Sequence, residues 1–318
     1  MEQIELGTTG LQVSRLGLGT VELGIPYGLS EDPPPTDEVC IRLLRDAHDQ
    51  GITYIDTAAA YGRSEELVGL AFSGMQDRPT ITTKVALRDS EGNPVGPGRL
   101  RQHIEASVER SLQWLQADRL DILKIHSADD RFLSDELVES MQLLVERGRV
   151  RSWGASTYET IALADALSEP KLRVIQVAYS LLDRRLDDEL LPRARVQGVG
   201  IVLRSVFLKG VLSDRRRQLS QEMAPLARAA DAAARIAAEA GLALSQVALR
   251  FALFSGAGDV TLVGTAQQEE LQENLEACAA GPLPEDVVAA LMAIEVEDSS
   301  LLNPGNWPTE PVHSKQAH

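Results

Sequence analysis

The chain has 318 residues, enough for one large single-core domain, and its hydrophobic fraction of 44% and charged fraction of 25% are ordinary for a soluble globular protein. With 31 basic and 47 acidic residues, its net charge of −16 argues against partners such as nucleic acid or an anionic membrane. No window approaches the roughly 18 uncharged apolar residues of a membrane span, and the N-terminus lacks the basic and apolar regions of a signal peptide. We therefore expect a cytoplasmic protein.

The two cysteines, Cys40 and Cys278, lie far apart inside predicted helices. They form no Cys-x-x-Cys pair and have no adjacent histidine, so the sequence offers neither a zinc site nor a disulfide framework. We expect both to be buried small hydrophobic residues, and we expect no bound metal.

Short apolar runs typical of buried strands alternate with amphipathic helical stretches from residue 16 to residue 280. The predicted strands are Leu16–Gly19, Ile52–Asp56, Thr80–Lys84, Asp121–His126, Val150–Ala155, Val174–Ala178, Gly200–Ser205 and Val260–Val263. The predicted helices are Thr36–Gln50, Glu65–Phe72, Gly98–Leu115, Ser134–Arg147, Thr157–Leu167, Asp187–Gln197, Ser245–Phe254 and Gln267–Ala280. Eight strands, each followed by a helix, predict an α/β fold: a (β/α)8 TIM barrel forming a single domain over 1–318.

Further segments stand outside the eight units. Ile4–Val13 carries a Gly-Thr-Thr-Gly turn between two short runs and predicts a hairpin that plugs the barrel floor. Pro225–Ala240 and Pro284–Ile294 predict two extra helices, the first beginning with a proline suited to a first turn. The polar, proline-containing stretch from Asp298 onward predicts a loop and tail.

Four polar residues fall at or just past the ends of predicted strands: Asp56, Tyr61, Lys84 and His126. Each alone has an ordinary interpretation, such as a turn cap, a surface aromatic or a buried core histidine. Side chains at the carboxyl ends of barrel strands converge on one mouth, which is where barrel enzymes hold their active sites. A carboxylate, a phenol, an ammonium and an imidazole at one mouth predict a proton-transfer site.

The segments that carry these residues resemble the aldo-keto reductase superfamily. GITYIDTAAAYGRSEELVG, TTK and DILKIH carry the resemblance, and WGAS, IQVAYS and LQENLEA follow in the family's order. The resemblance runs from the hairpin to about Ala280. It implies a barrel that binds NAD(P)(H) and transfers hydride between the nicotinamide and an aldehyde, a ketone or a sugar hemiacetal.

The resemblance assigns a role to each of the four residues. Tyr61 would be the general acid that protonates the carbonyl oxygen, but a free phenol, with a pKa of about 10, is a weak acid near neutrality. Lys84, as a nearby ammonium, would favour the phenolate form, and Asp56 would pair with Lys84 and hold it in place. His126 would hydrogen-bond and orient the substrate oxygen.

The nicotinamide end of the cofactor site is also implied by the resemblance. Ser156 and Gln176 carry over as carboxamide-binding residues, and Thr157 stands where the family has asparagine. Arg204 stands where the family has a ring-stacking aromatic; a planar guanidinium can stack on a ring, but its charge would penalise the oxidised nicotinamide. The loop expected over the pyrophosphate contains Ser205, Phe207, Lys209 and Gly210.

The adenosine end suggests which nucleotide is used. Members that prefer NADP place basic residues after the last strand, whereas this chain has Gly264, Thr265, Glu269 and Glu270 there. A 2′-phosphate beside Glu270 would be repelled, whereas a ribose diol could hydrogen-bond to it, so we expect NAD(H) to serve at least as well as NADP(H). The alternative is that these acids only stabilise a helix N-terminus. The pair expected at the adenine is Glu273 and Asn274.

The substrate pocket is weakly specified, and Tyr27, Phe132 and Trp307 are the candidates to touch substrate. A regulatory subunit that binds the cofactor on the same fold is the main alternative function, because fold alone does not exclude it. A Schiff-base aldolase using Lys84 or Lys124 is a third possibility, but it leaves the cofactor residues unexplained. We expect a monomer or small homo-oligomer.

Overall fold

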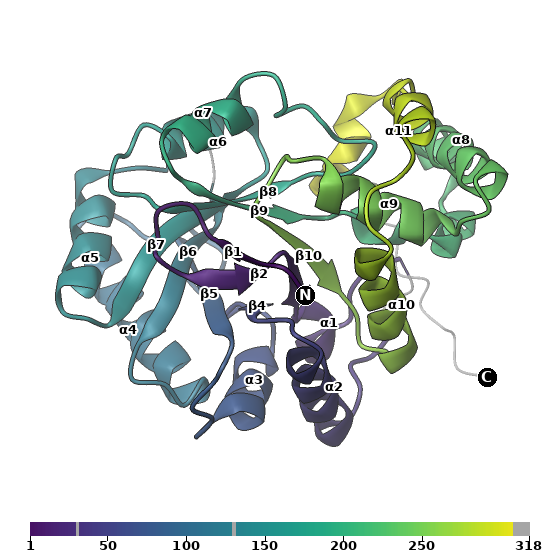
Figure 1. Cartoon of the computed structure of the whole chain (residues 1–318). Coiled ribbons are helices and arrows are strands. Elements are labelled where there is room, and N and C mark those ends of the chain that lie inside the picture. Colours follow the sequence, from purple (N-terminus) through teal and green to yellow (C-terminus); the bar gives the residue numbers. More distant parts are fainter. Residues whose placement is uncertain (30–31, 129–131, 308–318) are drawn as a thin grey trace, which may run out of the picture.

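Eight parallel strands form a closed barrel, as predicted (Figure 1). The computed structural model describes residues 1–29, 32–128 and 132–307. The strands are β3 (Leu16–Gly19), β4 (Tyr54–Asp56), β5 (Thr80–Ala86), β6 (Leu120–Ala128), β7 (Val150–Thr157), β8 (Val174–Ala178), β9 (Gly200–Arg204) and β10 (Val260–Gly264). Each strand pairs with the next along the chain, and β10 closes the ring on β3. All carboxyl ends therefore meet at one mouth.

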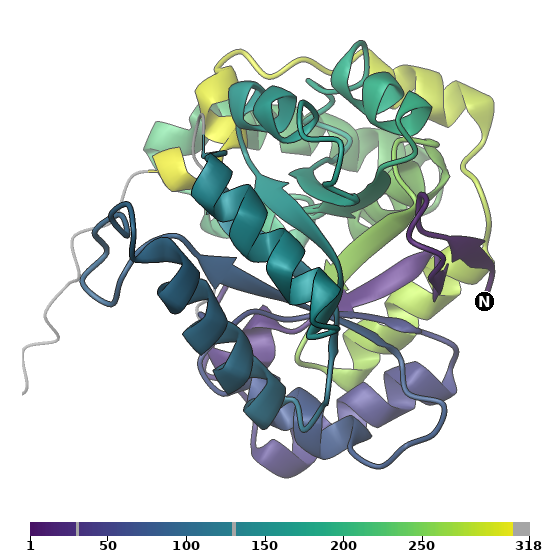
Figure 2. The same cartoon turned by 90° about the vertical axis from the view of Figure 1, so that its left-hand side faces the viewer.

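Helices wrap the outside of the barrel (Figure 2). They are α2 (Asp37–Asp49), α3 (Ser64–Phe72), α4 (Leu100–Trp114), α5 (Asp135–Glu146), α6 (Thr160–Ala166), α7 (Leu190–Val196), α9 (Leu244–Phe254) and α10 (Gln268–Ala279). Their apolar stripes face the strands: in α4, for example, Leu100, Ile104, Val108 and Leu112 are all buried. The helical periodicity of the sequence thus corresponds to the faces that pack on the sheet.

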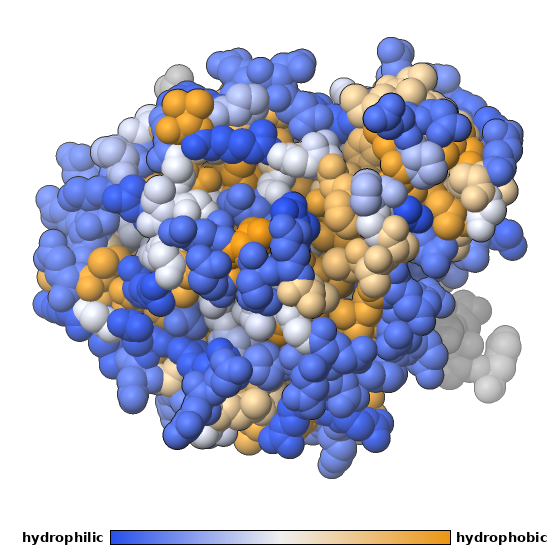
Figure 3. All heavy atoms as spheres, in the orientation of Figure 1, coloured by the Kyte–Doolittle hydropathy of each residue, from blue (hydrophilic) through white to orange (hydrophobic). Residues whose placement is uncertain are grey.

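The predicted hairpin closes the barrel floor. Strands β1 (Gln3–Glu5) and β2 (Gln12–Ser14) pair antiparallel, and in Figure 1 they cross the centre of the ring. Leu6, Leu11 and Val13 join the apolar side chains that fill the lower interior, and the outer face of this end is largely hydrophilic (Figure 3). The floor is therefore a packed plug, and ligands have access from the opposite end.

Both predicted extra helices are present, as α8 (Ala224–Glu239) and α11 (Glu285–Met292), and they lie beside each other in Figure 1. Shorter elements escaped prediction: α1 (Val21–Gly24), and the 3-10 turns η1 (Leu208–Gly210), η2 (Asp214–Gln218) and η3 (Gln221–Met223). In the described part of the chain no single helix has the length and apolarity to cross a membrane. Two consecutive helical segments, Gln221–Glu239 and Leu244–Phe254, reach that length and apolarity only when taken together, and the chain bends by 94° between them.

The stretch after Asp298 is more ordered than a loop. It forms two 3-10 turns, η4 (Ser299–Leu302) and η5 (Pro304–Asn306), and Leu301 and Leu302 are buried against the core. The sequence did not predict these turns, because the two buried leucines lie in a stretch that is otherwise polar and rich in proline. Residues 308–318 lie outside the described part of the chain.

Two smaller expectations also need correction. The predicted helix Thr157–Leu167 begins only at Thr160, because Thr157 pairs with Val177 as the last residue of β7. Cys40 is fully buried as predicted, but Cys278 is only partly buried. The buried stripe of α10 contains Leu271 and Ala277, and Cys278 lies at the edge of this stripe.

Candidate active site

A buried charge cluster occupies the barrel interior just below the mouth. Asp56, the last residue of β4, accepts hydrogen bonds from Lys84 Nζ at 2.6 Å and Thr82 Oγ1 at 2.8 Å, both on β5. It also accepts a short hydrogen bond from Lys124 Nζ on β6. Burial alone would raise the pKa of Asp56, but the two ammonium groups hold it well below its usual range. Asp56 is therefore an anion that two lysines share.

Lys84 connects this cluster to Tyr61. Its Nζ donates to the Thr57 carbonyl at 2.8 Å and to the Tyr61 hydroxyl at 3.3 Å, and it lies 4.7 Å from the centre of the Tyr61 ring. Burial would lower the pKa of Lys84, yet the neighbouring Asp56 and Tyr61 hold it above its usual value. Lys84 is thus a fixed cation against the phenol oxygen.

The turn between β4 and α3 fixes the backbone of Tyr61. Its N–H donates to the Ala58 carbonyl and its own carbonyl accepts from the Ser64 N–H, both at 3.0 Å. Helix α1 packs so tightly on this turn that a Cβ on Gly24 would lie 1.8 Å from the Tyr61 carbonyl oxygen. Gly62 has a φ of +54°, and a Cβ there would lie 2.3 Å from the Gly24 carbonyl oxygen. Only glycine fits both positions.

His126 on β6 completes the group that the sequence predicted at the mouth. Its ring meets the Tyr61 ring edge-on, with centroids 5.5 Å apart and planes at 83°. Burial, assisted by the Lys84 ammonium, lowers the pKa of His126 to about 3. The imidazole is therefore neutral near pH 7 and has one N–H to donate.

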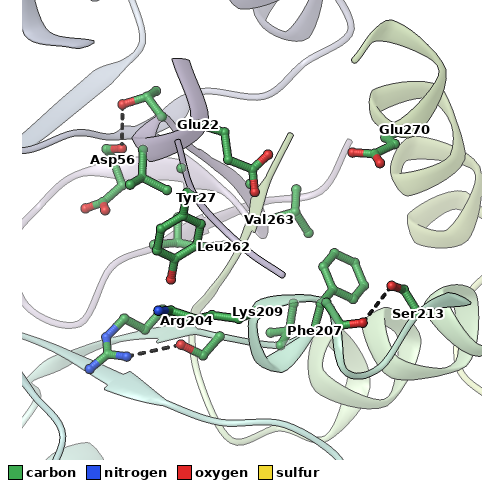
Figure 4. A pocket seen from close by; sticks show the side chains of 18 of the residues that line it. Glu22, Tyr27, Asp56, Arg204, Phe207, Lys209, Ser213, Leu262, Val263 and Glu270 are labelled. Atoms are coloured by element: carbon green, nitrogen blue, oxygen red, sulfur yellow. Dashed lines mark hydrogen bonds between the residues drawn. The ribbon is translucent and has the colours of Figure 1, made fainter. Parts of the chain in front are cut away.

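A cavity of about 380 Å³ opens above the cluster. Tyr61, His126 and Asp56 line its inner part, and Lys84 lies beneath them. The cavity also brings together most of the predicted cofactor residues, namely Ser156, Gln176, Arg204, Ser205, Phe207, Lys209, Gly210, Gly264, Glu270, Glu273 and Asn274. Figure 4 shows Glu22 and Tyr27 entering from one side and Arg204 and Phe207 from the other. Thr157 and Thr265 are buried and do not line the cavity.

The inner wall holds an unpaired amide. Gln176 on β8 is fully buried and lines the cavity, and within the described residues neither its Oε1 nor its Nε2 has a hydrogen-bond partner. Buried polar atoms are normally paired. An amide-bearing ligand group at this position would satisfy both atoms of Gln176.

Arg204 is already engaged on its own side of the cavity. Its guanidinium carbon lies 3.6 Å from the centre of the Tyr158 ring, and it donates to the Thr157 carbonyl at 2.9 Å and to Ser205 Oγ at 3.1 Å. Arg204 therefore stacks on a side chain of this protein, a contact that the sequence did not predict. Thr157 contributes its backbone oxygen here.

The far end of the cavity contains an ion pair that the sequence did not indicate. Arg215 in η2 bonds Glu270 Oε1 at 3.0 Å, and Thr265 Oγ1 donates to Glu270 Oε2 at 2.7 Å. Glu22 of α1 also lines this end, where burial and the Glu270 carboxylate raise its pKa to about 7. The stretch around Glu270 thus has a basic neighbour, supplied from another loop.

A second hollow of about 730 Å³ adjoins the first and shares Tyr27, Ser127, Tyr158 and Lys209 with it. Of the three predicted substrate residues, Tyr27 lines both spaces. Trp307 is outside both linings, with Lys209 Nζ 5.8 Å from its ring centre and 5.2 Å from that of Tyr27. Phe132 packs on the hydrophobic core and also lines neither hollow.

Several residues at the site were not assigned from the sequence, among them Glu22, Tyr158 and Arg215. Lys124 was considered only as a nucleophile of the aldolase alternative. Lys124 carried a signal, because a lysine inside an apolar strand must either point outward or find a buried partner. Arg215 carried none, since the turn that brings it to Glu270 depends on how the loop after β9 folds over the cavity. Tyr158 and Glu22 gave no signal beyond their loop positions.

A buried cluster of titratable side chains thus lies at the carboxyl mouth of a TIM barrel, below a cavity that offers an unpaired amide, and this is the end at which barrel enzymes hold their active sites. The chain belongs to the aldo/keto reductase family, whose model matches residues 15–296. Members of this family carry out nicotinamide-dependent carbonyl reduction. The resemblance stated from the sequence is thereby confirmed.

Individual relatives agree with this assignment. The chain is 34% identical over 217 residues to the aldo-keto reductase YhdN of Bacillus subtilis, a match of 67% of this chain and 64% of that protein. It is 32% identical over 228 residues to the NADH-specific methylglyoxal reductase of Escherichia coli, covering 67% and 69% of the two chains. The aldo-keto reductase AKR11C1 of Bacillus halodurans, solved in its holo form, has a TM-score of 0.76 and 27% identity over 93% of this chain and 96% of that chain.

Proposed function

We propose that this protein transfers hydride between a nicotinamide cofactor and the carbonyl carbon of an aldehyde, a ketone or a sugar hemiacetal. The observation that carries the proposal is the Tyr61 hydroxyl, held 3.3 Å from a buried ammonium at the inner end of the cavity. A phenol held against a fixed cation is suited to giving and taking a proton at a substrate oxygen.

The residues present fit a nicotinamide. Gln176 offers a paired donor and acceptor with no partner among the described residues, which matches the acceptor and donor of a carboxamide. Ser156 lies on the neighbouring strand in register with Gln176 and also lines the cavity. When bound, the cofactor would supply the hydride, which no side chain can provide.

The proposed chemical roles follow from the contacts. Tyr61 donates its proton to the substrate oxygen in reduction and takes it back in alcohol oxidation. Lys84 stabilises the phenolate that remains, and Asp56 holds Lys84 in position. Neutral His126 donates a hydrogen bond to the same oxygen and so orients the carbonyl.

The direct test is Tyr61→Phe. It should reduce kcat for carbonyl reduction by about 1,000-fold or more, while the Kd of the cofactor stays within a few-fold, because the phenol acts on the substrate oxygen. Near-normal turnover in this variant would remove Tyr61 from the mechanism. Tight cofactor binding by the wild-type protein without turnover across a panel of carbonyls would instead favour the regulatory alternative.

For the nucleotide we propose that NAD(H) serves at least as well as NADP(H). Three acids line the far end of the cavity, namely Glu22, Glu270 and Glu273. The arginine at this end, Arg215, is already paired with Glu270. A 2′-phosphate would have to displace that pairing, whereas a ribose hydroxyl could hydrogen-bond to a carboxylate. The name of the E. coli relative, an NADH-specific reductase, is consistent with this choice.

Measured Kd values for NADH and NADPH test the nucleotide proposal, and an NADPH Kd about ten-fold below that of NADH would contradict it. Glu270→Gln should shift the preference toward NADPH, because it removes a carboxylate and releases Arg215. Glu269→Gln is the matched control, since Glu269 is the exposed neighbouring acid on α10 and lies outside the cavity lining. Equal shifts in nucleotide preference in the two variants would show that Glu270 does not set that preference.

A further inference from the structure

Lys124 is a buried cation for which the proposed reaction has no role. It lies on β6 directly across from Lys84 on β5, and both side chains are almost completely inaccessible to solvent. The two ammonium groups reach the same carboxylate, Asp56, from two sides. Within the described residues, Asp56 is the one hydrogen-bond partner of Lys124 Nζ.

This arrangement is unfavourable for stability alone. Like charges directly opposite on neighbouring strands repel each other, and a buried ammonium is costly unless it is fully paired. One carboxylate cannot neutralise two lysines, so Asp56, Lys84 and Lys124 together carry a net charge of +1. The layer below is apolar, with Tyr54 and Ile122, and would accept an uncharged side chain at position 124.

The surroundings of Lys124 show where its charge acts. The charged and titratable groups near it come from four elements: Asp56 and Tyr54 from β4, Lys84 from β5, His126 from its own strand and Arg204 from β9. Its neighbour on β7 is Gly154, which has no side chain. Asp56 is the one anion among these groups, and it lies between Lys124 and Lys84.

We propose that Lys124 is a positioning and tuning residue of the proton-transfer site. Its positive charge offsets the negative charge of Asp56, so that Asp56 cancels little of the effect of the Lys84 ammonium on the Tyr61 hydroxyl. The inference rests on the proposed function. With Lys84 and Asp56 alone, the phenol oxygen would face a neutral ion pair. With Lys124 it faces a cluster of net charge +1, which stabilises the phenolate form of Tyr61.

The tuning depends on pH. Burial lowers the pKa of Lys124 to about 8. The Lys84 charge lowers this pKa further by a smaller amount, whereas the attraction of Asp56 raises it. Lys124 therefore carries its charge below about pH 8 and loses it above. Its effect on Tyr61 should be full near pH 6 to 7 and should fade at higher pH.

Alcohol oxidation tests this inference, because its rate depends on the phenolate form of Tyr61. Lys124→Met should lower kcat/KM for oxidation by about three- to ten-fold at pH 6 to 7, and the two proteins should converge above about pH 9. A purely structural role of Lys124 would make the ratio of wild-type to variant kcat/KM independent of pH. A ratio of wild-type to variant kcat/KM that stays constant with pH, or that is near one at every pH, overturns the proposal. Lys124→Gln repeats the test should the methionine variant fold poorly.

Lys171→Met is the matched control, since it removes one positive charge at an exposed site away from the cavity and should leave the profile unchanged. A second readout needs no turnover: the phenolate absorbance of Tyr61, isolated by subtracting the spectrum of the corresponding Tyr61→Phe protein. The phenolate should appear at lower pH with Lys124 than with methionine at that position, and an identical onset would contradict the inference. If the wild-type protein turns over no carbonyl or alcohol, the proposed function fails, and this titration still decides the role of Lys124.

Discussion

Asp56 shows what a single residue of this site depends on. Its position at a strand end could be predicted from the sequence, because Asp56 ends an apolar run, and the family resemblance implied its pairing with Lys84. The second lysine could not be predicted, since only the register of β5 against β6 places Lys124 opposite Lys84. Register is a property of the assembled sheet, and a shift of one residue would turn Lys124 away from the interior.

Replacing Asp56 should therefore affect stability more than the loss of one ion pair would suggest. Asp56→Asn leaves two buried ammonium groups without an anion, which we expect to cost roughly 3–5 kcal/mol in the free energy of unfolding. Lys124→Met removes the excess charge instead and should be neutral or slightly stabilising. Urea denaturation of both variants measures the difference, and a loss of less than about 1 kcal/mol in Asp56→Asn would show that the cluster is not held as the structure indicates.

At the scale of elements, the long periodic segments could be predicted and the short ones could not. Strand and helix periods in the sequence locate all eight barrel units, but α1 has four residues, too few to show a period. Yet α1 holds the turn that carries Tyr61. The same limit concealed η4, whose buried leucines lie in an otherwise polar stretch.

The contact between α1 and the Tyr61 turn can be tested at Gly24. A Cβ at this position would lie 1.8 Å from the Tyr61 carbonyl oxygen, so Gly24→Ala must displace the turn. A displacement of about 1 Å at a proton donor can lower kcat/KM by up to about 100-fold. Gly96→Ala is the control, because a Cβ at Gly96 meets nothing within 4 Å. Equal activity of the two variants, measured by steady-state carbonyl reduction, would show that α1 does not position Tyr61.

At the scale of the whole molecule, the alternation of strands and helices predicted the barrel, and the barrel in turn brought Asp56, Tyr61, Lys84 and His126 to one mouth. What the alternation cannot predict is how loops fold over that mouth. Arg215 of η2, which lies in the segment after β9, is bonded to Glu270 in the first turn of α10. Long-range loop contacts depend on the closed ring, and no local pattern encodes them.

The closed ring places the hairpin plug at one end and the candidate active site at the other, so that stability and the proposed activity can be tested separately. Gly7 in the hairpin has a φ of +49°, and a Cβ there would lie 2.3 Å from the Gly200 nitrogen at the start of β9. Gly10 has a φ of +67°, but its Cβ would meet nothing closer than an Arg151 side-chain nitrogen at 3.5 Å. Both alanine variants carry backbone strain of about 1 kcal/mol, and only Gly7→Ala adds a collision that lifts the plug.

We therefore expect Gly7→Ala to lower the free energy of unfolding by at least about 2 kcal/mol, and clearly more than Gly10→Ala, in urea denaturation. Because the plug is remote from Tyr61, the kcat of the folded fraction should stay within about two-fold of wild type at a temperature well below the unfolding transition. Equal destabilisation by the two substitutions would mean that the hairpin yields without disturbing the barrel. A fall in kcat that parallels the fall in stability would mean that floor and mouth are mechanically coupled, contrary to the separation seen in the packing of the interior.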